Sequence, residues 1–190
     1  MHCGSIFRMA HQFSTSYLKD SIALFRYYKQ LGDRAIAQVS DEHLASTLDP
    51  EMNSIALIVK HLAGNMRSRW TDFLTTDGEK PDRNRDSEFE AAPQTRKEIT
   101  AMWEQGWALV FGALEPLTDA DLTRTVTIRH EPHSVMQAIN RQIAHYSYHV
   151  GQIVFLAKHF QSDQWKSLSV PRNRSAEFNE KVKRGEASQR

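Results

Sequence analysis

Cysteine is nearly absent from this sequence, which contains only Cys3. Because a disulfide within one chain needs two cysteines, the fold does not depend on an oxidising compartment. The first residues, MHCGSIFRMAHQF, also lack the basic region and the apolar run of a secretory signal. These absences predict a cytoplasmic protein.

Long apolar runs and an excess of one charge are also missing. No uncharged apolar stretch approaches the roughly 20 residues that a membrane-spanning helix needs, so we expect no membrane partner. The 24 Lys and Arg residues balance 23 Asp and Glu residues, which leaves a net charge of +1. This balance gives no electrostatic reason to expect nucleic acid as a partner. A chain of 190 residues is long enough for one well-packed domain.

Helical periodicity, by contrast, covers much of the chain. Apolar residues recur at steps of three and four in four segments, at residues 14–39, 54–74, 94–114 and 134–160. Asn53 or Ser54 is placed to cap the second segment, and Ser134 to cap the fourth. Gly32 lies inside the first segment, where it predicts a kink or a close contact. The pattern predicts an all-α fold of four helices.

Two of the connections between these helical segments have a distinctive composition. Residues 75–93 are polar and charged, which predicts a long surface loop, and such loops in compact domains are often functional or mobile. Residues 123–129, TRTVTIR, alternate and are rich in β-branched side chains. They predict a short strand, as part of a flap or hairpin, just before the last helix.

Two of the nine histidines, His145 and His149, are four residues apart in the last helical segment. At about 100° per residue they lie about 40° apart and one turn along, so both imidazoles can reach one cation. His61, in the second segment, lies at a similar offset from the apolar stripe of its own helix. Three neutral imidazoles from these residues leave a fourth tetrahedral position of a divalent metal for water or substrate.

Other interpretations of these histidines stay open. Paired histidines on a helix are more often surface or hydrogen-bonded groups than metal ligands, and a single His61 is by default an interfacial histidine. No H-E-x-x-H motif is present, because Tyr146, Ser147 and Tyr148 separate the pair. His130 and His133 form a weaker competing pair in a loop, since Pro132 separates them. Glu131 beside them is a loop carboxylate, and the sequence does not show which way its side chain points.

The segments NSIALIVKHLAGNMRSRWTDF, TVTIRHEPHSV and NRQIAHYSYHVGQIVFLAKH resemble the DinB/YfiT-like superfamily, and in particular a bacterial branch of it without an assigned substrate. The most specific element is H-x3-H-x-G-Q at His145, His149, Gly151 and Gln152, together with K-H-L at His61. The resemblance covers nearly the whole chain, and it implies a bundle at residues 13–178. Because no helical pattern precedes Phe13, we expect a disordered N-terminus (1–12), and we expect a flexible C-terminus (179–190).

The resemblance implies an up-down-down-up four-helix bundle in which His61, His145 and His149 hold one zinc or nickel ion. Three imidazoles do not choose between these metals. Characterised relatives are thiol-dependent: they include bacillithiol S-transferases, mycothiol-dependent isomerases and the helical part of enzymes that join ergothioneine precursors. The resemblance therefore implies thiol chemistry, with a low-molecular-weight thiol and a small electrophile as partners. It also implies a homodimer.

The leading hypothesis is a metal-dependent thiol S-transferase, in which Asn65, Gln142 and Gln152 orient the imidazoles or the substrate. Arg69 and Arg141 lie near the same faces and are candidates to meet a substrate carboxylate. One alternative is a metal-dependent hydrolase, which is disfavoured because no positioned carboxylate base is evident. Another is a non-catalytic metal-binding bundle of a stress response.

A stripe at four-residue steps in the third segment, Trp103, Trp107 and Phe111, is a candidate dimer surface. The alternative, and the commoner fate of such a stripe, is that it belongs wholly to the core.

Overall fold

The structure is a computed structural model and describes residues 15–188. Its four long helices are α1 (Tyr17–Ile36), α3 (Ile55–Trp70), α4 (Arg96–Leu114) and α5 (Val135–Gln161). The shorter elements are α2 (Asp41–Leu44), η1 (Asp86–Phe89), η2 (Asp119–Thr123), β1 (Thr125–Ile128), β2 (Glu131–Ser134), η3 (Ser162–Gln164) and α6 (Ser175–Lys183). The predicted all-α four-helix bundle with a short β segment before the last helix is confirmed.

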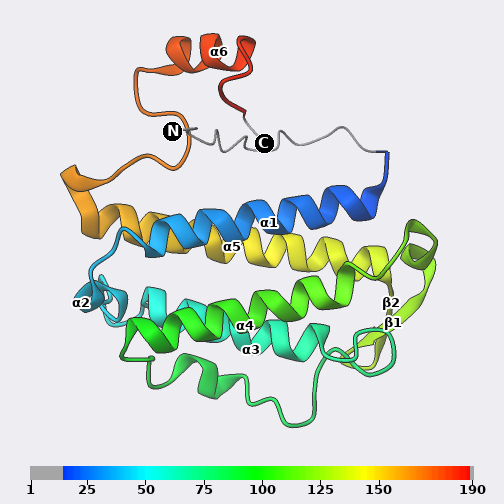
Figure 1. Cartoon of the computed structure of the whole chain (residues 1–190). Coiled ribbons are helices and arrows are strands. Elements are labelled where there is room, and N and C mark those ends of the chain that lie inside the picture. The colour runs from blue at the N-terminus through cyan, green and yellow to red at the C-terminus, as the bar shows by residue number, and fades with distance from the viewer. Residues whose placement is uncertain (1–14, 189–190) are drawn as a thin grey trace, which may run out of the picture.

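The four long helices follow the up-down-down-up order (Figure 1). Helices α1 and α5 run in one direction, and α3 and α4 run side by side in the other. A 16-residue helix is about 24 Å long, so the chain must return over that distance before a parallel α4 can begin. Residues 71–95 make this return, and we call them the crossover loop. The long polar loop expected at residues 75–93 is therefore a consequence of the topology.

Side-chain caps fix where the helices begin. Ser54 accepts a hydrogen bond from the backbone N–H of Leu57 and begins α3, so it is the cap rather than Asn53. Ser134 and Gln137 form a capping box at the start of α5, as the serine there suggested. Such reciprocal bonds satisfy backbone N–H groups that have no partner inside the helix.

The strand predicted at residues 123–129 is one arm of a hairpin in which β1 and β2 pair antiparallel. Its turn residues Arg129 and His130 both have positive φ, at 54° and 65°. Asp77 of the crossover loop accepts hydrogen bonds from both of their backbone N–H groups, at 2.9 and 2.8 Å. The backbone N–H of Gly78 donates to the carbonyl of Thr127 at 2.7 Å. These bonds tie the crossover loop to the hairpin.

Aromatic side chains fill the centre of the bundle, and Trp103 and Trp107 of α4 are among them. Gly32 makes the predicted close contact, because a Cβ there would lie 2.7 Å from Cη2 of Trp103. The ring of the half-buried Phe111 stacks on Trp107, with centroids 5.8 Å apart. The stripe offered as a dimer surface therefore belongs mainly to the core.

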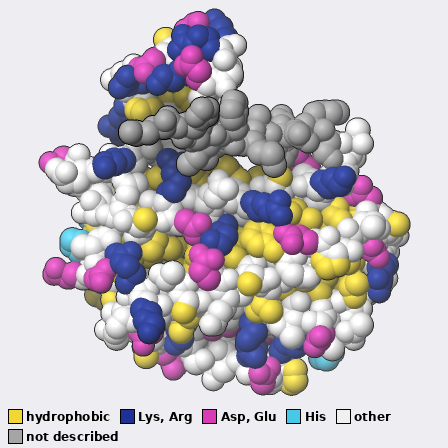
Figure 2. Space-filling model, viewed as in Figure 1, with side chains coloured by type: hydrophobic (Ala, Val, Ile, Leu, Met, Phe, Trp, Pro, Cys, Tyr) yellow, Lys and Arg dark blue, Asp and Glu magenta, His cyan; other side chains and the backbone are white. Residues whose placement is uncertain are grey.

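The surface, the helix lengths and the chain ends relate to the expectations about charge, membrane partners and domain bounds. On the face that carries α1 and α4, basic and acidic side chains are interspersed (Figure 2). Within residues 15–188, every helix is too short or too polar to cross a membrane. The expected disordered N-terminus at residues 1–12 lies outside the described residues. Helix α6, which has no buried residue, spans position 178, and the predicted division at that position stays a prediction.

Candidate metal centre

His61 of α3 and His145 and His149 of α5 meet at one point beside the core, and we call them the histidine centre. Nε2 of His145 lies 3.2 Å from Nε2 of His61 and 3.1 Å from Nε2 of His149. One ring nitrogen from each residue lies within 4.8 Å of the others. His130 of the competing loop pair lies in the hairpin turn with its side chain 98% exposed, and it takes no part.

A buried chain of hydrogen bonds sets α3 against α5 at this level. Nε1–H of Trp70 donates to the hydroxyl of Tyr146 at 2.8 Å, and that hydroxyl donates to Oδ1 of Asn65 at 3.2 Å. Tyr146 is fully buried and is the neighbour of His145 along the chain. Because the tyrosine joins the two helices, it fixes which part of α5 faces His61.

The outer ring nitrogens of two imidazoles are held by acceptors. Nδ1 of His61 lies 2.8 Å from Oε2 of Glu88, and Nδ1 of His149 lies 2.8 Å from Oε1 of Gln152. Carboxylate and carbonyl oxygens accept hydrogen bonds, so each Nδ1 carries the proton and, in a neutral imidazole, Nε2 keeps a lone pair. Both lone pairs point at Nε2 of His145, which can donate at most one proton. A cation at this point would satisfy all three nitrogens.

Two of the three separations between these nitrogens match those expected around a divalent ion. Two imidazole nitrogens about 2.0–2.1 Å from one zinc ion are roughly 3.3 Å apart at a tetrahedral angle and roughly 2.9 Å apart at an octahedral one. The observed separations of 3.1 and 3.2 Å lie between these values. The three histidines therefore lie close enough to bind one metal ion. Neither the spacing nor the ligand type distinguishes zinc from nickel.

Burial prepares the histidines of α5 to bind a cation. It lowers the pKa of His145 to about 3, and the other two imidazoles and the guanidinium of Arg69 act in the same direction. Burial also lowers the pKa of His149 to about 4, although the hydrogen bond with Gln152 opposes this effect. Both imidazoles are thus neutral at pH 7, which is the form that binds metal.

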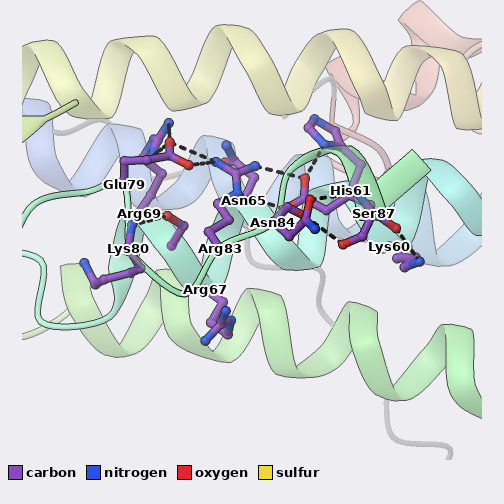
Figure 3. Close-up of polar contacts among 12 residues, drawn as sticks. Lys60, His61, Asn65, Arg67, Arg69, Glu79, Lys80, Arg83, Asn84 and Ser87 are labelled. Carbon is purple, nitrogen blue, oxygen red and sulfur yellow. Dashed lines mark hydrogen bonds and ion pairs between the residues drawn. The ribbon is translucent and has the colours of Figure 1, made fainter. Parts of the chain in front are cut away.

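The crossover loop brings a buried carboxylate, Glu88, to the histidine centre. Nζ of Lys60 anchors this part of the loop by donating to the backbone carbonyls of Ser87 and Glu90, at 2.6 and 2.8 Å (Figure 3). Gly64 of α3 gives Glu88 room, because a Cβ there would lie 2.7 Å from Cδ of the glutamate. The sequence analysis did not single out this carboxylate, because its position depends on how the crossover loop folds.

Glu88 is not free to act as a base. Its Oε2 accepts from His61, and Arg83 donates from Nε to Oε1 at 2.8 Å and from Nη2 to Oε2 at 3.0 Å. Burial raises the pKa of Glu88, but the hydrogen bonds from His61 and Arg83 more than offset this effect and hold the pKa below its ordinary value. The carboxylate is therefore an ionised group that orients His61.

A second carboxylate, Glu79, links three segments at the end of the site. It accepts hydrogen bonds from Arg69 of α3, Arg83 of the crossover loop and Arg129 of the hairpin turn, at 3.1 to 3.3 Å (Figure 3). Arg69 also donates to the carbonyl of Gly78. Arg69 and Arg83 are buried, so this cluster fixes the loop and the hairpin against α3.

The histidine centre opens into a cleft of about 540 Å³. Its lining also includes the three amides singled out from the sequence, Asn65, Gln142 and Gln152. Only Gln152 hydrogen-bonds an imidazole, since Asn65 is held by Tyr146. Gln142 is 2% exposed, and its Oε1 has no hydrogen-bond partner among the described residues. Gln152 is thus the amide of the three that contacts an imidazole, and a role for Asn65 and Gln142 in binding a ligand stays a prediction.

The comparisons with known proteins agree with this architecture. A family model described as "Protein of unknown function (DUF1572)" matches residues 12–174. The chain belongs to the DUF1572 family. A solved DinB-like protein from Bacillus cereus ATCC 10987 is similar to this DUF1572 chain with a TM-score of 0.59 and 18% identity, over 77% of this chain and 94% of that one. This likeness supports the DinB-like fold. A search of curated proteins finds no match.

Proposed function

We propose that this DUF1572 chain is a cytoplasmic, divalent-metal-dependent thiol S-transferase, which joins a low-molecular-weight thiol to a small electrophile. The observation that carries the proposal is the convergence of three imidazole nitrogens at the wall of an open cleft. His61, His145 and His149 would hold one zinc or nickel ion. The cleft volume of about 540 Å³ is within the range of pockets that bind small molecules.

A zinc or nickel ion, when bound, lowers the pKa of a thiol that coordinates it. The residues of the chain favour the anionic sulfur in two ways. Three neutral imidazoles leave the charge of the ion uncompensated, and guanidinium groups surround the cleft. Glu88 and Gln152 hold two of the imidazoles by Nδ1, so that their Nε2 lone pairs keep facing the same point. Asn65 and Gln142 supply amides that can orient the two substrates.

Among the described residues, the lining of the cleft contains no carboxylate. Glu88 lies behind His61 and has both oxygens engaged. Attack by water usually profits from a nearby base, whereas a thiol whose pKa is already lowered does not need one. This difference favours thiol transfer over hydrolysis. A metal-binding bundle without catalytic activity remains an outcome of the experiment below.

The test is a panel of bacillithiol, mycothiol, glutathione and cysteine against monochlorobimane, with metal-loaded and chelated protein. His149→Ala removes a proposed ligand, and His159→Ala is the matched control on the same helix, away from the cleft. We expect at least one thiol to react above the chelated rate in wild type and in His159→Ala only. If every thiol reacts at the chelated rate, the transferase proposal fails and the non-catalytic metal-binding bundle replaces it.

The expected homodimer needs a surface other than Trp103 and Trp107, which are buried. Helix α5 offers one, because Tyr148 and Phe155 are 59% and 61% exposed and lie seven residues apart on the same side of the helix. Tyr148 also lines the cleft. We propose that two chains associate through this face of α5.

A further inference from the structure

Five arginines line the cleft: Arg69, Arg83, Arg85, Arg129 and Arg141. Three of them share the carboxylate of Glu79, and one of these three also binds Glu88. Within the part of the chain that the structure describes, the five guanidinium groups therefore pair with only two carboxylates, neither of which lines the cleft. The cleft has an excess of positive charge before any metal is considered.

The excess positive charge of the cleft comes from two arginines. Within residues 15–188, Arg85 and Arg141 form no ion pair and no side-chain hydrogen bond, and both side chains are exposed to the cleft. The sequence singled out Arg69 and Arg141 as candidates to meet a carboxylate. Arg69 is already engaged by Glu79 and by the carbonyl of Gly78, so only Arg141 of that pair is free.

The two free arginines come from different elements beside the histidine centre. Arg141 is on α5, one turn before His145, and therefore on the same face as that histidine. Arg85 is on the crossover loop directly before η1, with its Cζ 5.0 Å from the ring centroid of Phe89. The ring of Phe89 in turn stacks on His61, with centroids 4.6 Å apart. This cation–π contact holds the Arg85 guanidinium close to the histidine centre without neutralising it.

We infer that the cleft binds an anionic small molecule, whose carboxylate or phosphate groups are held by Arg85 and Arg141. A guanidinium group presents paired N–H donors that match the oxygens of either anion. The amides of Asn65 and Gln142 face the uncharged part of the same molecule. The inference rests on the proposed function in one respect, since it makes the thiol or the electrophile of that reaction an anionic compound.

Titration calorimetry with succinate and inorganic phosphate tests the inference, with succinamide as the uncharged counterpart. The proteins are wild type, Arg85→Gln, Arg141→Gln, the double variant and Arg172→Gln, all metal-loaded. Arg172 is an exposed arginine outside the cleft, and it has no ion pair with any described residue. We expect at least one anion to bind roughly tenfold more tightly than succinamide, and each cleft variant to lose roughly tenfold in affinity. Arg172→Gln should match wild type.

The choice between the probes identifies the anion, because tighter binding of succinate indicates carboxylates and tighter binding of phosphate indicates a phosphate. Equal binding of succinamide and both anions overturns the inference. So does anion binding that persists in the double variant and disappears on chelation, because the anion then contacts the metal alone. Thermal melting checks that the variants fold. Arginine-dependent anion binding without thiol turnover would remove the proposed function and leave this subsite standing.

Discussion

Glu88 and Gly64 are in direct contact, the carboxylate of one lying where a side chain on the other would be. A Cβ at residue 64 would come within 2.7 Å of Cδ of Glu88. Because that carboxylate also holds Nδ1 of His61, the absence of a side chain at one position of α3 controls the orientation of an imidazole one turn earlier.

The first prediction follows from this contact. Gly64→Ala should displace Glu88 and raise the dissociation constant for zinc about tenfold, the loss typical of a disturbed partner of a metal-binding histidine. It should also lower the free energy of unfolding by about 1–3 kcal/mol through overpacking, even though alanine favours a helix. Competition with a chromogenic chelator and urea unfolding measure the two effects.

Gly112→Ala is the matched control, because a Cβ at this position of α4 meets no atom of the described residues within 4 Å. It should raise the free energy of unfolding by about 0.5–1 kcal/mol and leave the zinc affinity unchanged. Equal zinc affinity in Gly64→Ala and wild type would mean that Glu88 adjusts without moving His61.

The second prediction concerns the charge of Glu88. Glu88→Gln keeps the shape of the side chain but removes the carboxylate that fixes His61, so zinc affinity should fall by about 10- to 100-fold. Glu90→Gln, two residues away at an exposed position, should leave the affinity unchanged. If both variants bind zinc like wild type, the orientation of His61 does not depend on this carboxylate.

The third prediction is a loss of stability of the metal-free protein in mild acid. His145 and His149 have pKa values of about 3 and 4 in the folded chain and about 6.5 when unfolded. Between these values the unfolded chain binds more protons, so the free energy of unfolding falls as the pH drops from 6.5 towards 4. Urea unfolding at pH 7, 6 and 5, with chelator present, measures the slope.

The double variant His145→Asn, His149→Asn is the comparison for this slope. It should show a markedly weaker pH dependence over the same range. The carboxylates of the site, Glu79 and Glu88, contribute little between pH 7 and pH 5, since their pKa values are near 4.5 in the unfolded chain and lower in the folded one. An equally steep slope in the variant would assign the acid sensitivity to other groups.

The fourth prediction is that the protein is a dimer of the 21.9 kDa chain at tens of micromolar, and that Phe155→Ser makes it a monomer. The substitution removes an exposed aromatic ring from the proposed α5 face and leaves the core intact. Light scattering on a sizing column gives the mass. Val182→Ser on α6 is the control and should remain a dimer. A wild-type mass of one chain would reject the dimer.

The helices of the bundle could be predicted because each repeats a periodic apolar face over many residues, and two of them, α3 and α5, begin at a serine cap that the sequence indicates. The convergence of the histidines followed from the same regularity, since His145 and His149 share a helix face and His61 has a matching offset. The site as a set of metal ligands stays a prediction, which the experiments above test.

The residues that the crossover loop brings to the site could not be predicted from the sequence. Glu79, Arg83 and Glu88 lie in a segment without periodicity, so nothing in their spacing shows which way they point. Their positions depend on contacts with distant residues such as Gly64 and Arg129. Trp107 shows a different limit of the sequence. An aromatic stripe predicts that a helix face is buried, but it does not say whether that face packs against the same chain or against a second copy.

The crossover loop has a consequence for how such proteins diverge. It supplies Glu79, Arg83, Arg85, Glu88 and Phe89 to the site, yet it is not one of the four helices whose packing holds the bundle together. Substitutions at loop positions such as Arg85 can therefore change the charge of the cleft without repacking the core. A bundle with this topology can acquire a new ligand preference by mutation in one segment, while the histidines and the helices that carry them stay as they are.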